Sequence, residues 1–127
     1  MRRTLVIAAV VLALSIALCA VSAALVGRVI GGAESLRLSA MRAAEAGDLA
    51  RARALAGQLL SDWQADEKTM ELITAHDALG EVEASLQDAL ICLDAGNAVE
   101  FLRAASEAGA ALHRIRVAEA VRLMNPF

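Results

Sequence analysis

The chain has 127 residues and a formal net charge of −3, and 58% of its residues are hydrophobic while only 2% are aromatic. From Arg28 onward there are 10 basic and 15 acidic residues, a net charge of −5 for that part. A nucleic-acid-binding surface needs a basic footprint, so we expect no nucleic acid among the partners. With one proline, two phenylalanines and no tyrosine, the composition favours an all-α fold.

The N-terminal segment is typical of a membrane-spanning helix. Arg2 and Arg3 precede an uncharged apolar run from Thr4 to Gly27. Its 24 residues would form a helix of about 36 Å, which is enough to cross a hydrocarbon core of about 30 Å. The two arginines predict a cytoplasmic N-terminus and a chain that continues outside the cell membrane. We therefore expect a membrane anchor over residues 1–30 and an extracytoplasmic helical domain over residues 31–127.

Cleavage of this segment is the alternative to an anchor. Residues 21–23 (Val-Ser-Ala) end in small side chains that suit a signal-peptide cleavage site, and cleavage would give a secreted helical protein. The apolar run is longer than the roughly 7–15 residues usual for a signal peptide, which favours an uncleaved anchor. A lipid anchor at Cys19 is disfavoured because Leu18 stands where a small residue is needed. Cys19 lies inside the apolar run, so we expect no disulfide with Cys92.

The remainder of the chain carries apolar residues at helical spacing, which predicts four helices over residues 33–46, 48–63, 66–94 and 97–124. Three glycines (Gly27, Gly31 and Gly32) predict a loosened exit from the membrane. A turn or kink is expected between Leu60 and Lys68, although no glycine or proline marks it.

Two short segments of similar form predict how these helices connect. Residues 45–48 (Glu-Ala-Gly-Asp) and 94–97 (Asp-Ala-Gly-Asn) each place a glycine before a residue that caps helices well. Each segment would join two antiparallel helices, which gives two helical hairpins. The simplest way to bury four apolar stripes is then a four-helix antiparallel bundle behind the N-terminal transmembrane helix. A packing of helical repeats is the competitor, but two hairpins are few for a solenoid.

The layout resembles a bacterial family known as domain of unknown function 4363. The residues that carry the resemblance are 47–48 (Gly-Asp), 62–63 (Asp-Trp), 70–71 (Met-Glu), 76–77 (His-Asp), 81–83 (Glu-Val-Glu) and 125–127 (Asn-Pro-Phe). The resemblance implies one membrane helix and a helical domain, and it points to Trp63 and His76. This chain is richer in alanine and arginine than that family, and Pro126 departs from its usual ending. The family has no established activity, so the resemblance implies no function.

His76 and Trp63 are the residues most open to a functional interpretation. His76 falls on the predicted apolar face of its helix, and a buried imidazole needs partners for both nitrogens. Glu83, two turns further along that face, is a candidate partner, and the simplest role of His76 is a polar clamp that sets helix register. A metal ligand or a pH- or ligand-sensing group are the alternatives, although the Glu-x-x-His spacing of di-metal bundles is absent from the sequence. Trp63 suits core packing, with ligand stacking as its alternative.

The sequence predicts no catalytic machinery. It has neither a Gly-x-Ser-x-Gly elbow nor a phosphate-cradling glycine loop, and we expect no catalytic residue, metal or cofactor. These features favour a non-enzymatic interaction or structural module at the cell envelope, held by its membrane helix and acting on a protein partner that the sequence does not identify. A small ligand-sensing ectodomain that acts through a partner is the rival interpretation.

Overall fold

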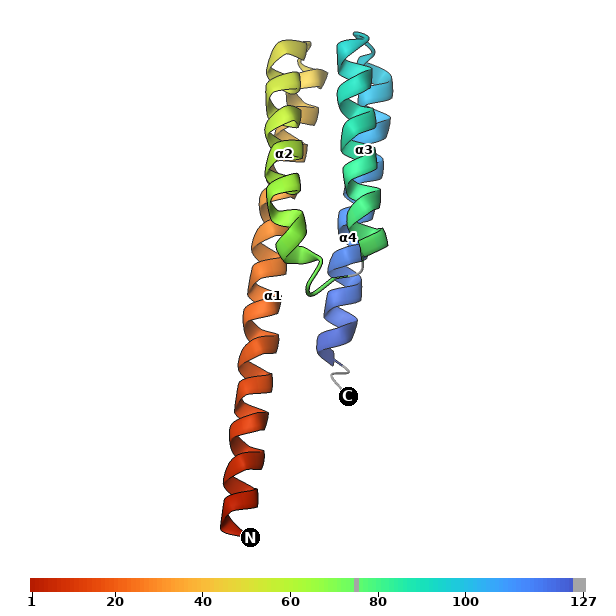
Figure 1. The fold of residues 1–127 in the computed structure, drawn as a ribbon. Coiled ribbons are helices and arrows are strands. Elements are labelled where there is room, and N and C mark those ends of the chain that lie inside the picture. Colours follow the sequence, from red (N-terminus) through yellow and green to blue (C-terminus); the bar gives the residue numbers. More distant parts are fainter. Residues whose placement is uncertain (75, 125–127) are drawn as a thin grey trace.

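The computed structural model describes residues 1–74 and 76–124, and all regular structure in this part is helical (Figure 1). The elements are α1 (Arg2–Glu45), α2 (Leu49–Met70), α3 (His76–Asp94) and α4 (Ala98–Met124). The main contacts join α1 to α2 and α4, and α3 to the same two helices, so each helix has two neighbours around a shared core. The predicted all-α antiparallel bundle is confirmed, with the long apolar helix at its N-terminus.

The membrane segment and the first bundle helix form one continuous helix of 44 residues. The predicted loosening at Gly27, Gly31 and Gly32 is therefore wrong, because all three lie inside α1. A glycine inside a helix costs about 1 kcal/mol relative to alanine. Buried residues on the other face, including Val26 and Ile30, hold this stretch in the bundle and offset that cost. Packing begins at Val26, a few residues before the predicted domain boundary at residue 30, whereas residues 1–21 are exposed.

The turn between α2 and α3 also differs from its predicted position. We expected the second helix to end near Trp63 and the third to begin near Asp66, but α2 continues to Met70 and α3 begins at His76. The buried residues Leu59, Trp63 and Met70 share one face of α2 at helical spacing, so burial extends the helix past the acidic residues. Within the connection, the Thr74 backbone amide donates to the Met70 carbonyl over 2.8 Å.

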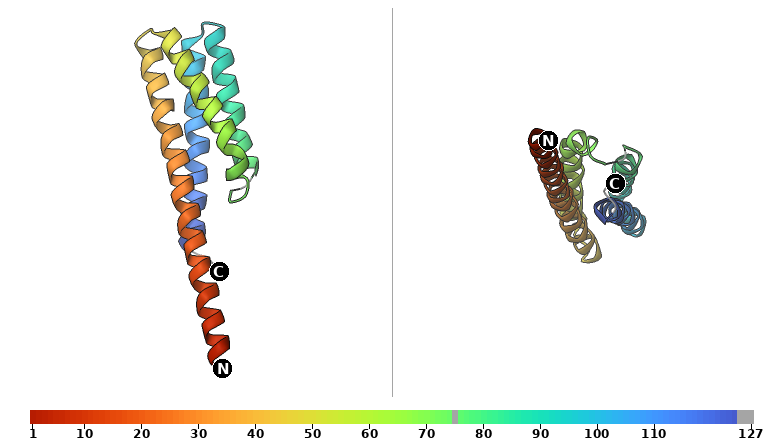
Figure 2. Two further views of the ribbon diagram at one scale, coloured as in Figure 1. Left: turned by 60° about the vertical axis from the view of Figure 1, so that its left-hand side comes forward. Right: turned by 90° about the horizontal axis from the view of Figure 1, so that it is seen from below.

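The two hairpin turns have the predicted form. Gly47 and Gly96 adopt the left-handed conformation, with φ of +82° and +73°. The backbone amides of Asp48 and Asn97 then bond back to carbonyls five residues earlier, each over 2.9 Å, which is the pattern of a Schellman motif. The Asp48 and Asn97 side chains cap the following helices by accepting from the amides three residues on, over 3.0 and 3.1 Å. Both turns lie at the end of the bundle away from the start of α1 and the end of α4 (Figure 2).

The core has two halves with different packing. Near the hairpin turns it is built mostly from alanine, with Leu93 and Phe101 as its two large residues. Toward the N-terminus of α1 the buried side chains are bulkier and surround Trp63. Because the separation of packed helices depends on the side chains between them, we expect the helices to lie closer together in the alanine-rich half.

Opposite effects are expected for alanine at two glycines. Gly96→Ala places a side chain in the left-handed region and should lower the free energy of unfolding by about 1–2 kcal/mol. Gly80 lies inside α3 with no atom within 4 Å of an added Cβ. Gly80→Ala should therefore raise the free energy of unfolding by about 0.5–1 kcal/mol. Chemical unfolding of the full chain in detergent, followed by circular dichroism, measures both. A loss of stability in Gly80→Ala would contradict the assignment of open space at that position.

Candidate functional site

Trp63 lies in the core and connects α2 to α3. Its side chain is 2% exposed, and its indole Nε1 donates to the Leu79 carbonyl over 3.3 Å. A buried tryptophan needs such an acceptor, because its ring is apolar but its N–H is not. The core position of Trp63 agrees with the sequence interpretation, and the hydrogen bond sets the position of α3 relative to α2.

An open groove of about 250 Å³ runs along α1 and α2 beside Trp63. It is lined by Arg28, Val29, Gly32, Ala33, Leu36, Leu59, Asp62, Trp63, Ala65 and Asp66. The groove therefore carries one basic and two acidic side chains along with apolar ones. His76 does not line it, so the structure does not bring together the two residues that the sequence singled out.

The predicted burial of His76 is wrong. Its side chain is 75% exposed, and its Nδ1 lies 3.1 Å from a carboxylate oxygen of Glu71. The physical reason is the position of the turn: because α2 extends to Met70, His76 is the first residue of α3 and not a residue in the middle of a packed helix. A solvent-exposed imidazole with one carboxylate neighbour cannot serve as a clamp inside the core.

Glu83 faces α2 and not His76. It is half-buried and accepts a hydrogen bond from Gln64 Nε2 over 3.1 Å. Burial raises the pKa of the nearby Glu67, and the Glu83 and Glu71 carboxyl groups raise it further, while His76 opposes them. The facing ends of α2 and α3 therefore bring acidic side chains together at some electrostatic cost.

Removing the Glu67 charge is expected to stabilise the protein at neutral pH. Because folding raises the pKa of Glu67, ionisation of this carboxyl group destabilises the folded state. This destabilisation sets in as pH rises through the folded pKa and is fully present at pH 7. Glu67→Gln should therefore raise the melting temperature at pH 7, and the difference from the unmodified chain should shrink toward pH 4. Thermal melts across this range measure the effect, with Glu45→Gln at the exposed end of α1 as the control. A difference that grows on acidification would contradict the raised pKa.

Two charged residues on α4 were missed by the sequence interpretation. Glu119 is buried at 8% exposure and pairs with Arg122 over 2.7 Å. Arg122 also donates to the Ile73 carbonyl over 2.7 Å, which ties the α2–α3 connection to α4. The signal was present in the sequence, because Glu119 follows Leu112 and Ile115 on the apolar face at steps of three and four.

A second charged group joins α1 to α4. Arg37, with a side chain only 12% exposed, pairs with Glu34 and donates to the Ala105 carbonyl over 3.3 Å. Hydrogen bonds from Arg37 lower the pKa of Glu34, against the effect of burial. Gly109 leaves room for the guanidinium, since a Cβ there would lie 2.5 Å from Arg37 Cζ. The absence of a side chain at Gly109 thus allows Arg37 of α1 to reach the Ala105 carbonyl of α4.

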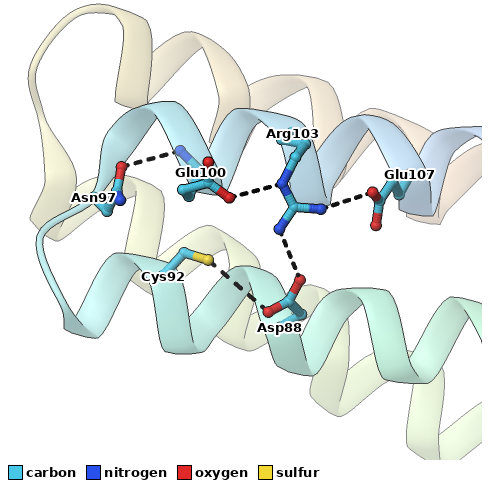
Figure 3. A network of polar contacts seen from close by, with 6 residues as sticks. All are labelled: Asp88, Cys92, Asn97, Glu100, Arg103 and Glu107. Carbon is cyan, nitrogen blue, oxygen red and sulfur yellow. Dashed lines mark hydrogen bonds and ion pairs between the residues drawn. The ribbon is translucent and has the colours of Figure 1, made fainter.

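The outer face of the α3–α4 hairpin carries an exposed polar network (Figure 3). Arg103 donates to Glu100 and Glu107, each over 2.7 Å, and to Asp88 over 3.3 Å. The two glutamates raise the pKa of the Arg103 guanidinium. The Cys92 thiol lies 4.0 Å from Asp88. Exposed ion pairs contribute about 0–1 kcal/mol each, so we expect this network to add little to the stability of the fold.

Across residues 1–74 and 76–124, no cluster of three or more histidine, cysteine, aspartate or glutamate side chains is placed to hold a metal ion. Within the same residues, α1 is the one helix that is long and apolar enough to cross a membrane. No protein-family model, curated protein or solved structure matches the chain. The resemblance to the domain of unknown function 4363 family stays a prediction.

Proposed function

We propose that this chain is a single-pass, membrane-anchored module whose extracytoplasmic bundle binds a protein partner at the cell envelope without enzymatic activity. The observation that carries the proposal is the free apolar segment of α1. Residues 2–21 are exposed outside the bundle and would extend about 30 Å as a helix, close to the thickness of a hydrocarbon core. Such a surface is stable only when lipid or protein covers it.

The charge pattern supports the orientation. Arg2 and Arg3 are the only charged residues before Arg28, and basic residues are retained on the cytoplasmic side. The bundle then lies outside. Because α1 passes from the anchor into the bundle as one helix, a partner that binds the bundle is held at a defined height above the membrane.

The composition of the core supports an interaction or structural role. Among the described residues, the buried side chains are apolar with the exception of Glu119, which has its own partner in Arg122. Enzyme sites gather polar groups with perturbed pKa values in a cleft. Here the raised pKa of Glu67 comes from burial and from the carboxyl groups of Glu83 and Glu71, and Glu67 does not line the groove beside Trp63.

Ligand sensing is the second candidate, and the groove beside Trp63 is the observation that favours it. Its charged lining residues, Arg28 opposite Asp62 and Asp66, suit a small polar ligand. Its volume of about 250 Å³ is below the roughly 300–1,000 Å³ typical of ligand pockets, which favours the interaction module.

Membrane extraction and protease accessibility test the proposal. The full-length chain, with a C-terminal tag, should stay in the membrane fraction after alkaline washing. Its tag should be digested by protease added to intact spheroplasts, while a cytoplasmic control protein survives. The intact mass of the recovered protein should correspond to a chain that still contains residues 1–23. A mass that matches cleavage after Ala23 would indicate a secreted protein. Release by alkali, or a tag protected until the cells are lysed, would overturn the anchor or the orientation respectively.

Proximity labelling from the same tagged chain tests the partner. A labelling enzyme fused after residue 127 should enrich one envelope protein relative to a fusion in which the bundle is replaced by an unrelated domain. Equal enrichment by both fusions would argue that the bundle itself recruits nothing.

A further inference from the structure

Exposed apolar side chains gather at the C-terminal end of α4. Among residues 22–74 and 76–124, eight large hydrophobic side chains are exposed, and half of them lie in the last eight residues of α4. These are Val117 at 47%, Val121 at 59%, Leu123 at 43% and Met124 at 86% exposure. The valines and Met124 follow one another at steps of four and three, so they form a stripe on one helix face. That face is opposite the buried Ile115 and Glu119.

The end of α4 lies beside the part of α1 that leaves the membrane segment. A cavity of about 190 Å³ between these two helices is lined by Ala23, Val26, Gly27, Ile30, Arg116, Glu119, Ala120 and Leu123. The last turn of α4 is thus level with residues 23–27 of α1. Beyond the α2–α3 connection, α4 continues toward the N-terminal half of α1 (Figures 1 and 2).

The length of the apolar run sets the depth of this turn. Residues 4–27 would span about 36 Å, while the hydrocarbon core is about 30 Å thick. If the run begins at the cytoplasmic edge of the core, its last four residues, 24–27, rise into the headgroup layer. These are the residues beside the end of α4, so the stripe on α4 faces sideways into that layer and not into bulk water.

Charged side chains at this end have protein partners of their own. Arg122 pairs with the buried Glu119 and donates to the Ile73 carbonyl. Arg28 shares its groove with Asp62 and Asp66. The surface that remains available at the end of α4 is therefore the apolar stripe.

We propose that residues 117–124 of α4 form a second membrane contact, in which Val117, Val121 and Met124 lie against the lipid interface. This inference rests on the proposed anchoring by α1. It adds to the anchor a lateral contact that holds the bundle upright. Covering the stripe with lipid removes its apolar surface from water, which favours the contact.

Depth-dependent quenching in vesicles tests the contact on the full-length chain. In a background with Cys19→Ser and Cys92→Ser, a single cysteine is introduced as Val121→Cys and labelled with an environment-sensitive fluorophore. Val99→Cys is the matched control, because Val99 is also an exposed valine of the same helix, at the end far from the anchor. Ala13→Cys reports on the anchor itself. The vesicles contain phosphatidylcholine and phosphatidylglycerol, with nitroxide-labelled lipid as the quencher.

The contact predicts that nitroxide lipid quenches the label at position 121 at least about twofold more than the label at position 99. Replacing Val117 and Met124 with glutamate should reduce that quenching, because the contact depends on the apolar stripe. Equal quenching at positions 121 and 99, with strong quenching at position 13, would overturn the α4 contact and leave the anchor intact. A label at 121 that is shielded from aqueous iodide but not quenched by nitroxide lipid would instead indicate a protein occupant. An unquenched label at position 13 would overturn the anchor itself.

Discussion

Trp63→Ala is expected to lower the free energy of unfolding by about 3–5 kcal/mol, a large part of the stability of a domain this size. The loss combines the missing apolar contacts of a side chain that is 2% exposed with the cavity left between α2 and α3. It also leaves the Leu79 carbonyl without the indole donor. Urea unfolding of the full chain in detergent, followed by circular dichroism, measures the change.

Trp63→Phe separates packing from the hydrogen bond. Phenylalanine keeps an aromatic ring but has no N–H, so its cost should be well below that of alanine. The control is Leu72→Ala, which removes a side chain that is 84% exposed and should change stability by less than about 0.5 kcal/mol. Equal and small effects for Trp63→Ala and Leu72→Ala would contradict the packing of Trp63 in the core.

Leu12→Arg combined with Ile16→Arg is expected to abolish membrane retention. An arginine near the centre of a spanning helix costs about 2.5–3.5 kcal/mol, so two of them cost about 6 kcal/mol of insertion free energy. Both side chains are exposed outside the bundle, at 52% and 61%, so the bundle should keep its fold. Alkaline extraction measures retention, and circular dichroism of the released protein checks the helices.

Leu38→Arg is the matched control for this prediction, since Leu38 is an exposed residue of the same helix within the bundle. It should leave the protein in the membrane fraction. Retention of the doubly substituted chain would mean that the free segment of α1 is covered by protein and not by lipid.

Local features of the sequence were enough to predict the hairpin turns and the helical fold. Gly47 and Gly96 adopt positive φ, and Asp48 and Asn97 cap the next helices, because these preferences depend on the backbone of a few neighbouring residues. The apolar stripe that includes Trp63 was also visible, since burial follows helical spacing. Predicting the apolar run at the N-terminus required only its length and its lack of charged residues.

The ends of the helices and the partners of polar residues could not be predicted in the same way. α2 passes through its acidic residues to Met70 because that side chain is buried against other helices. Met70 continues the apolar stripe of Trp63, but the acidic residues between them favoured a turn in the sequence interpretation. This shift moved His76 from an expected core position to the exposed start of α3. The contact of Arg122 with the Ile73 carbonyl joins segments that are 49 residues apart in the chain.

The sequence by itself therefore determined that the chain is helical, where its two tight turns fall, and that its N-terminus is long and apolar enough for a membrane. The tertiary structure decided that α1 remains unbroken through its glycines, that His76 is exposed, and that α4 ends beside residues 23–27. The physical reason is the range of the interactions. Caps, turns and hydrophobic spacing act over a few residues, whereas helix continuity, the burial of charges and the position of the end of α4 depend on which helices pack together.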